Sequence, residues 1–140
     1  MKIKIELSKI SKFLNINKPT IIINKELAFS YVNNIIYIDE NNNIKSLFLA
    51  LHELRHHYQY LYIKNNNDEL KKIWKNEFDN YDLNNYLNYN IELDAYSFSY
   101  LILKYIYKIN YNLPYLIKNK ILEYIKKNKY LYFNIFNYNL

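Results

Sequence analysis

The sequence predicts a single α+β domain over residues 1–140, in which a short antiparallel sheet packs on a long helix and further helices complete the core. Three short runs rich in β-branched and aromatic residues follow Pro19 and predict the strands. Apolar side chains at helical spacing over 44–64 and 90–109 predict the longest helices. A chain of 140 residues is long enough to bury one core but not two.

The first part of the chain is expected to hold the strands and one small helix. Residues 2–6 alternate and predict a short strand, whereas 7–14 have helical spacing. The runs TIIIN, AFSYV and IIYID predict a strand followed by a hairpin. Because the chain has no Gly, Asn is the residue best suited to positive φ, and Asn33-Asn34 is the expected hairpin turn.

The remainder predicts four helices. Asn42 or Asn43 can cap the first, over 44–64, and the tolerance of Asn for left-handed φ predicts its end at 65–67. Further helices are expected over 68–78, 90–109 and 114–127. The aromatic segment 129–140 suits a strand or a packed tail, and its pattern does not distinguish the two.

The composition excludes several classes of protein. The hydrophobic fraction is 51%, too high for a disordered chain. No apolar stretch approaches the roughly 20 residues of a membrane helix, and Glu6, Lys9 and Lys12 interrupt any signal-peptide core. We therefore expect a soluble, cytoplasmic protein without a membrane partner. With no Cys, any metal must be held by His and carboxylate side chains.

The net charge of +6 is weak evidence for a nucleic-acid partner. Asn, Ile, Lys and Tyr are abundant while Gly is absent, which is the pattern of an A/T-rich coding sequence. Lysines and aromatic residues over 114–133 would suit a single strand, but they are also explained as the solvated side of a helix. We expect no nucleic-acid partner.

The chemistry is concentrated in one segment, which reads HELRHH and holds all three histidines. On a helix, His52 and His56 lie one turn apart on the same face, so both rings can reach one metal ion. Glu53 lies about 100° around the helix, where it can act on a water bound to that ion. This is the zinc-peptidase arrangement.

A catalytic zinc needs a third protein ligand and an open position for water. Because no fourth His exists, a carboxylate on a later helix is expected. Glu92 is the preferred residue, with the small Ala95 one turn later allowing close helix approach. Asp94 points to another face of the helix, where it could accept a hydrogen bond from a ligand imidazole or pair with Arg55. Spacing alone leaves Glu92 and Asp94 interchangeable as the third ligand.

Neighbouring side chains on the same helix have two interpretations. Arg55 and Gln59 lie on the side of His52 and His56, where they can support the ligands or contact substrate, or simply pair with acidic groups. His57 points away from the face that carries His52 and His56, and it is expected to be partly exposed. Candidates for stabilising a developing oxyanion are His57, Tyr58 and Tyr96.

The HELRH and ELDAYSF segments, with the hairpin before them, resemble the minimal zincin core of the ImmA/IrrE-like zinc metallopeptidases, whose patterns are HExxH and Glu-x-x-Ala-x-x-Phe. The likeness spans roughly 20–105. It implies a zincin-like domain of gluzincin type with Zn²⁺ held by His52, His56 and Glu92, and with Glu53 as general base. It further implies packing roles for Ala95 and Phe98, and an edge strand at IIYID that could pair with an extended peptide.

The resemblance therefore implies a zinc-dependent endopeptidase. Its substrate would be a protein or peptide, with repressors and other regulators among the substrates of such relatives. Arg55 departs from the Gly that many relatives carry, and the chain is short. Both departures motivate an alternative, a zincin-like binding or inhibitor protein that acts on a protein partner without hydrolysing it.

Overall fold

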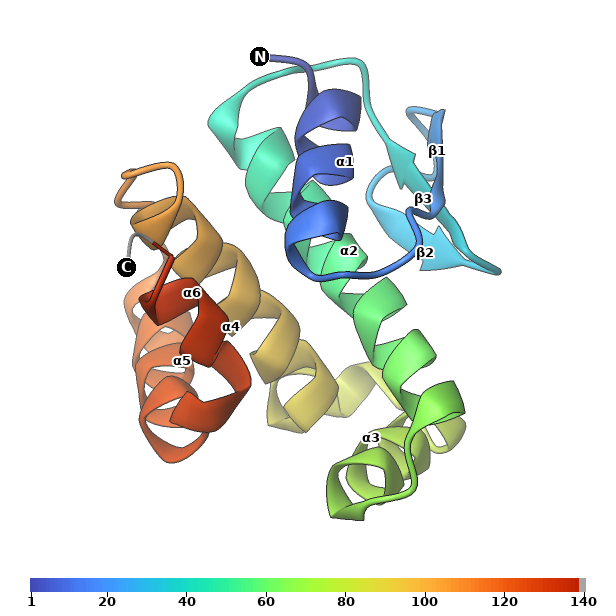
Figure 1. Cartoon of the computed structure of the whole chain (residues 1–140), viewed down its shortest axis with the longest axis vertical. Coiled ribbons are helices and arrows are strands. Elements are labelled where there is room, and N and C mark those ends of the chain that lie inside the picture. Colours follow the sequence, from blue (N-terminus) through green and yellow to red (C-terminus); the bar gives the residue numbers. More distant parts are fainter. Residues whose placement is uncertain (139–140) are drawn as a thin grey trace. The chain divides into compact units, whose positions relative to one another are not determined.

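The computed structural model describes residues 1–138 and confirms the predicted α+β class (Figure 1). The chain forms two compact units, Met1–Asn66 and Asn67–Leu140. The first holds the strands and the helix that carries the histidines, and the second is helical. The prediction of one domain over 1–140 stays a prediction. Among the described residues, none of the helices combines the length and apolar character needed to cross a bilayer.

The first unit begins with a helix where a strand was predicted. Helix α1 spans Ile3–Phe13, so the strand predicted over 2–6 is wrong. Ile3 and Leu7 are buried one turn apart, whereas Ile5 is 52% exposed. Over so few residues, a single buried face of a helix looks like the alternation of a strand, and the continuation of that face to Ile10 favours the helix.

The sheet is mixed rather than wholly antiparallel. Its strands are β1 (Thr20–Ile23), β2 (Ser30–Val32) and β3 (Ile35–Ile38), in the order β1-β3-β2. Strand β2 pairs antiparallel with β3, and β1 pairs parallel with it. The hairpin turn is confirmed, because Asn33 and Asn34 have φ of 52° and 66°.

Strand β3 is central, so the expectation that IIYID forms an edge strand is wrong. The reason is burial. Ile36 and Ile38 are 0% and 3% exposed, whereas β1 is mostly exposed. The more buried strand β3 is therefore hydrogen-bonded on both of its edges. The outer edges of the sheet, where an extended peptide could pair, belong to β1 and β2.

Helix α2 spans Ile44–Asn65 and packs against β2 and β3. Its N-cap is Asn43, whose side chain accepts a hydrogen bond from the Ser46 backbone N–H at 2.8 Å. The predicted left-handed end is wrong, because Asn66 is extended, with φ −129° and ψ 160°. The side-chain amides of Asn65 and Asn66 instead donate to the carbonyls of the last turn, which removes the need for a left-handed residue there.

The second unit is built around an apolar helix. Its elements are α3 (Glu69–Asp79), the 3-10 helix η1 (Leu83–Asn88), α4 (Asn90–Tyr105), α5 (Tyr115–Lys127), the 3-10 helix η2 (Lys129–Tyr132) and α6 (Phe133–Phe136). Helices α3, α5 and α6 all pack on α4. The C-terminal segment is therefore a packed helical tail, in which Tyr132 and Ile135 are buried. The last two residues of that segment lie outside the described range.

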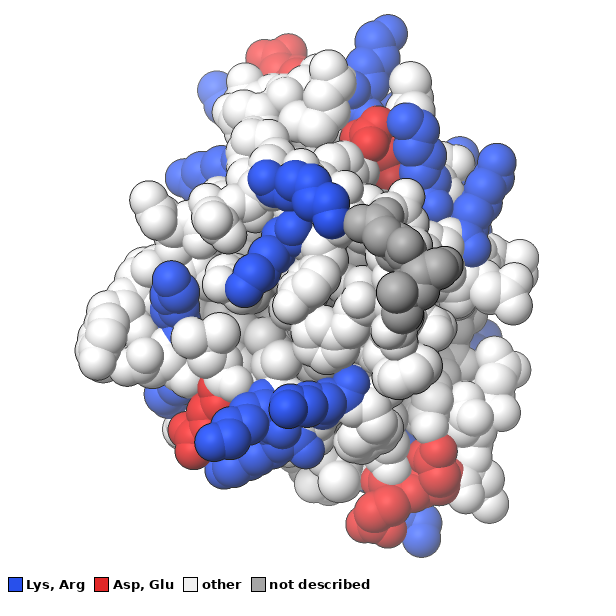
Figure 2. Space-filling view, turned by 60° about the vertical axis from the view of Figure 1, so that its left-hand side comes forward, with Lys and Arg blue, Asp and Glu red and all other residues white. Residues whose placement is uncertain are grey.

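Helix α5 has one buried side and one basic side. Ile121 and Ile125 are buried, whereas Lys120, Lys126 and Lys127 are exposed. In Figure 2, lysine side chains stand out from the surface in several separate groups, some of them beside acidic side chains. The buried isoleucines and exposed lysines of α5 are typical of a helix with one solvated face.

Candidate metal centre

Helix α2 brings the two histidines of the HELRH segment together. The Nε2 atoms of His52 and His56 lie 3.1 Å apart, and the rings meet edge to face with centroids 4.8 Å apart. Two imidazole nitrogens bound at about 2.0–2.1 Å to one tetrahedral zinc ion lie about 3.3 Å from each other. The side chains are 4% and 9% exposed. The pair therefore has the spacing and the sheltered position of two ligands to one ion.

Gln59 determines the tautomer of His56. Its Oε1 atom lies 2.9 Å from Nδ1 of His56, so that ring nitrogen carries the proton and donates it to the amide. In the neutral ring, Nε2 of His56 is then the nitrogen without a proton, and it lies on the side of His52. Gln59 is fully buried. Of the two interpretations left open for Gln59, the contact with His56 agrees with support of a predicted ligand, and that role stays a prediction.

Two other side chains on α2 flank the histidines. Glu53 directly follows His52 and is partly buried. Arg55 is 2% exposed, and its guanidinium carbon lies 4.2 Å from the ring centroid of Tyr58. A cation over an aromatic face is stabilised by the ring quadrupole, so the bulky side chain is accommodated by packing on Tyr58.

His57 is buried, not partly exposed as predicted. It is 3% exposed, and its Nε2 donates to the carbonyl oxygen of Asn17 at 2.9 Å. Its Nδ1 lies 2.9 Å from the hydroxyl of Tyr31. Burial lowers the pKa of His57 from its ordinary value, and the bond to Asn17 opposes that shift. His57 therefore links α2 to the chain before β1 and to β2.

Glu92 lies in the first turn of α4, where the helix dipole favours a negative charge. It is 4% exposed, and its Oε2 accepts a hydrogen bond from the hydroxyl of Tyr81 at 2.5 Å. The start of α4 is itself held by Glu77 of α3, whose carboxylate accepts the backbone N–H groups of Asn90 and Ile91. The carboxylate of Glu92 is therefore both buried and oriented.

Asp94 has different surroundings from Glu92. It is fully buried, and its Oδ1 accepts a hydrogen bond from the hydroxyl of Tyr132 at 2.7 Å. Tyr132 belongs to η2, so this contact anchors the C-terminal tail on α4. Of the two carboxylates that spacing left interchangeable, Asp94 thus has a structural partner within the helical unit.

A group of tyrosines surrounds the start of α4. The hydroxyls of Tyr86 and Tyr96 lie 2.8 Å apart. Burial raises the pKa of Tyr86 strongly, and the hydrogen bond to Tyr96 and the nearby Glu92 carboxylate add to the effect. Tyr86 is therefore a neutral phenol over the whole physiological range, able to donate a hydrogen bond.

The contact between Tyr81 and Glu92 was not predicted. Eighteen tyrosines are spread along the chain, so residue type alone could not single out Tyr81. Its position ahead of η1, in an irregular segment, offers no periodicity from which its direction could be predicted.

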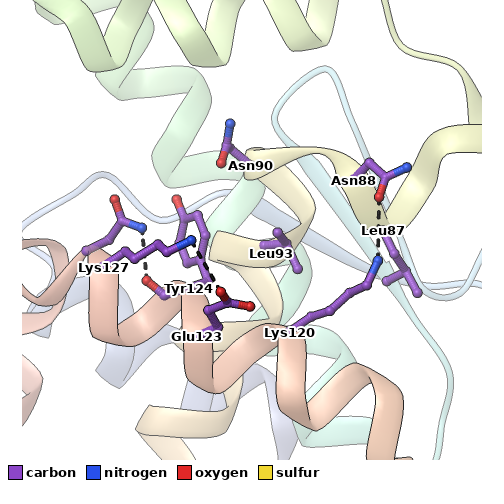
Figure 3. A pocket seen from close by; sticks show the side chains of 9 residues that line it. Leu87, Asn88, Asn90, Leu93, Lys120, Glu123, Tyr124 and Lys127 are labelled. Atoms are coloured by element: carbon purple, nitrogen blue, oxygen red, sulfur yellow. Dashed lines mark hydrogen bonds and ion pairs between the residues drawn. The ribbon is translucent and has the colours of Figure 1, made fainter.

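The helical unit also contains an open pocket of about 310 Å³ (Figure 3). It lies beside α5, where Lys127 pairs with Glu123 at 3.3 Å and Lys120 approaches the side chain of Asn88 at 3.5 Å. Glu92 is not among its lining residues. The pocket is thus separate from the predicted chemistry.

Comparison with known proteins gives no match: no family model, no curated protein and no solved structure matches this chain.

Proposed function

We propose that this protein is a zinc-dependent endopeptidase, in which His52, His56 and Glu92 hold the metal and Glu53 is the general base. The observation that carries the proposal is the geometry of the histidine pair. Two sheltered Nε2 atoms lie 3.1 Å apart, and Gln59 holds the proton of His56 on the opposite side of the ring. Binding of one metal ion by both nitrogens would be compatible with this spacing.

The choice of Glu92 as third ligand has separate support. Burying a carboxylate costs free energy unless it is hydrogen-bonded, and the hydroxyl of Tyr81 donates such a bond to Glu92. Among the described residues, His52, His56 and Glu92 make up a group of ligand-type side chains that could hold one metal ion. Two imidazoles and one carboxylate are a donor set that suits zinc, and three protein ligands leave a fourth position for water.

The reaction assigned to these residues is peptide hydrolysis. Bound zinc would lower the pKa of a coordinated water and polarise the scissile carbonyl. Glu53 accepts a proton as the water attacks and delivers it to the leaving amine. Ligation requires neutral rings at His52 and His56, and the contact with Gln59 places a proton of His56 on Nδ1, away from Nε2.

The test combines metal content with hydrolysis. Purified protein is measured for zinc by elemental analysis and incubated with a mixed peptide library, with cleavage followed by mass spectrometry. We expect one zinc per chain and cleavage that is lost in Glu53→Gln, while the zinc is retained. Glu26→Gln is the matched control, because Glu26 is an exposed glutamate in the loop between β1 and β2.

The outcomes separate the two functions considered. Protein without stoichiometric zinc, or a Glu53→Gln variant that cleaves as well as the wild type, contradicts the proposal. Stoichiometric zinc with no cleavage of any peptide by the wild type supports the alternative, a zincin-like binding protein.

A further inference from the structure

We propose that Tyr81 is a positioning residue for the metal ligand Glu92. This inference rests on the proposed function, and it deepens it by naming a side chain that sets how the carboxylate meets the ion. The phenol O–H of Tyr81 donates to Oε2 of Glu92 at 2.5 Å, a distance typical of a strong charge-assisted hydrogen bond.

This hydrogen bond restrains the carboxylate. The side chain of Glu92 ends in a planar group that otherwise rotates broadly about its last torsion. With Oε2 hydrogen-bonded to the phenol, that rotation is restricted, and the carboxylate would be held in one orientation for metal binding. Partners of this kind orient metal-ligating carboxylates and raise metal affinity.

Tyr81 is itself held by the helix that carries Glu92. Tyr89 is the N-cap residue of α4, and its ring stacks on that of Tyr81 with centroids 5.0 Å apart. The hydroxyl of Tyr89 accepts from the backbone N–H of Asp82 at 2.8 Å and donates to the carbonyl of Asn80 at 3.2 Å. The residues on both sides of Tyr81 are therefore fastened to Tyr89.

Hydrogen bonds therefore connect Tyr81, Tyr89 and Glu92 within one unit. Glu92 lies three residues after Tyr89, the hydroxyl of Tyr89 bonds to the backbone on both sides of Tyr81, and the hydroxyl of Tyr81 donates to Glu92. Tyr81 is 37% exposed whereas Glu92 is 4% exposed. The hydroxyl of the partly exposed Tyr81 thus reaches a carboxylate that is almost fully buried.

The test measures zinc affinity of the full chain by competition with a chromophoric chelator. We expect Tyr81→Phe to bind zinc about 10- to 100-fold more weakly than the wild type. Tyr89→Phe should shift the affinity in the same direction by less, because the ring remains but its hydroxyl contacts are lost. The control is Tyr115→Phe, at a tyrosine that is 75% exposed, which should leave the affinity unchanged.

A second readout separates positioning from general destabilisation. Cobalt(II) is substituted for zinc, and the visible absorption bands report the coordination number and symmetry of the site. We expect Tyr81→Phe to change the position and intensity of these bands while the circular dichroism spectrum and the melting temperature stay near those of the wild type. A merely structural role would shift the melting temperature and leave the bands of the loaded protein unaltered.

The results distinguish this inference from the proposed function. Wild-type protein that binds neither zinc nor cobalt overturns both. Wild-type protein that binds one ion, together with a Tyr81→Phe variant of the same affinity and the same cobalt spectrum, overturns the positioning role alone.

Discussion

Gln59 accepts the Nδ1–H of His56 at 2.9 Å, and in the neutral ring this contact leaves Nε2 of His56 without a proton on the side where Nε2 of His52 lies. The donor and acceptor are both on α2, three residues apart, so the contact is created within one turn of helix. The helix thus carries two histidines and also the group that sets the tautomer of one of them.

The first prediction concerns Gln59. We expect Gln59→Leu to weaken zinc binding about 10-fold or more, because His56 loses the acceptor that holds its proton on Nδ1. Gln59→Glu should retain most of the affinity, since a carboxylate accepts the same hydrogen bond. Chelator competition measures both variants. Equal affinities for the leucine and glutamate variants would show that the acceptor has no influence on the ligand.

The second prediction separates the two carboxylates of α4. Glu92→Gln should lower zinc affinity by more than about 100-fold, because losing a ligand costs more than losing an outer partner. Asp94→Asn should keep stoichiometric zinc but lower the free energy of unfolding by about 1 to 2 kcal/mol, since the bond from Tyr132 loses its charged acceptor. Elemental analysis and urea denaturation measure the two effects. Zinc retained in Glu92→Gln and lost in Asp94→Asn would assign the ligand to Asp94.

Features set by neighbouring residues could be predicted from the sequence. The left-handed Asn33 and Asn34, the cap at Asn43 and the juxtaposition of His52 and His56 all depend on local geometry. A helix repeats every 3.6 residues, so residues four apart meet whatever surrounds them. This is why the histidine pair follows from the sequence.

Features set by distant residues could not be predicted. The burial of His57 depends on Asn17, which lies 40 residues away, and the central place of β3 depends on the parallel pairing with β1. The partner of Asp94 is Tyr132, 38 residues later, in a segment whose pattern did not distinguish strand from tail. Such contacts arise from packing, for which the local pattern carries no signal.

The third prediction concerns the cap of α2. The side chain of Asn43 satisfies the backbone N–H of Ser46, one of the donors at the helix start that has no intrahelical partner. We expect Asn43→Ala to lower the free energy of unfolding by about 1 kcal/mol, and Asn43→Asp to preserve it. Asn112→Ala, at an exposed position outside the helices, is the control. Chemical denaturation measures the difference, and equal stability of Asn43→Ala and Asn112→Ala would contradict the capping role.

The fourth prediction concerns alkaline pH. Burial, with a smaller contribution from nearby Tyr60, raises the pKa of Tyr31 to about 12 from its ordinary value of 10.0. Between these two values the unfolded chain releases the phenol proton while the folded chain retains it, so the unfolded state binds fewer protons. The titration of Tyr31 therefore lowers the free energy of unfolding as pH rises from about 10 toward 12. Well below pH 10 it has no effect on that free energy.

Tyr31→Phe removes this titration, and we expect the free energy of unfolding to fall less steeply over that range than in the wild type. The comparison is made between slopes, because Tyr31→Phe also loses the hydroxyl contact to His57 and starts from a lower stability at neutral pH. Tyr115→Phe, at a tyrosine that is 75% exposed, should retain the wild-type slope. Denaturation at closely spaced pH values supplies the slopes. A Tyr31→Phe slope equal to those of the wild type and Tyr115→Phe would show that the Tyr31 phenol titrates alike in the folded and unfolded chains.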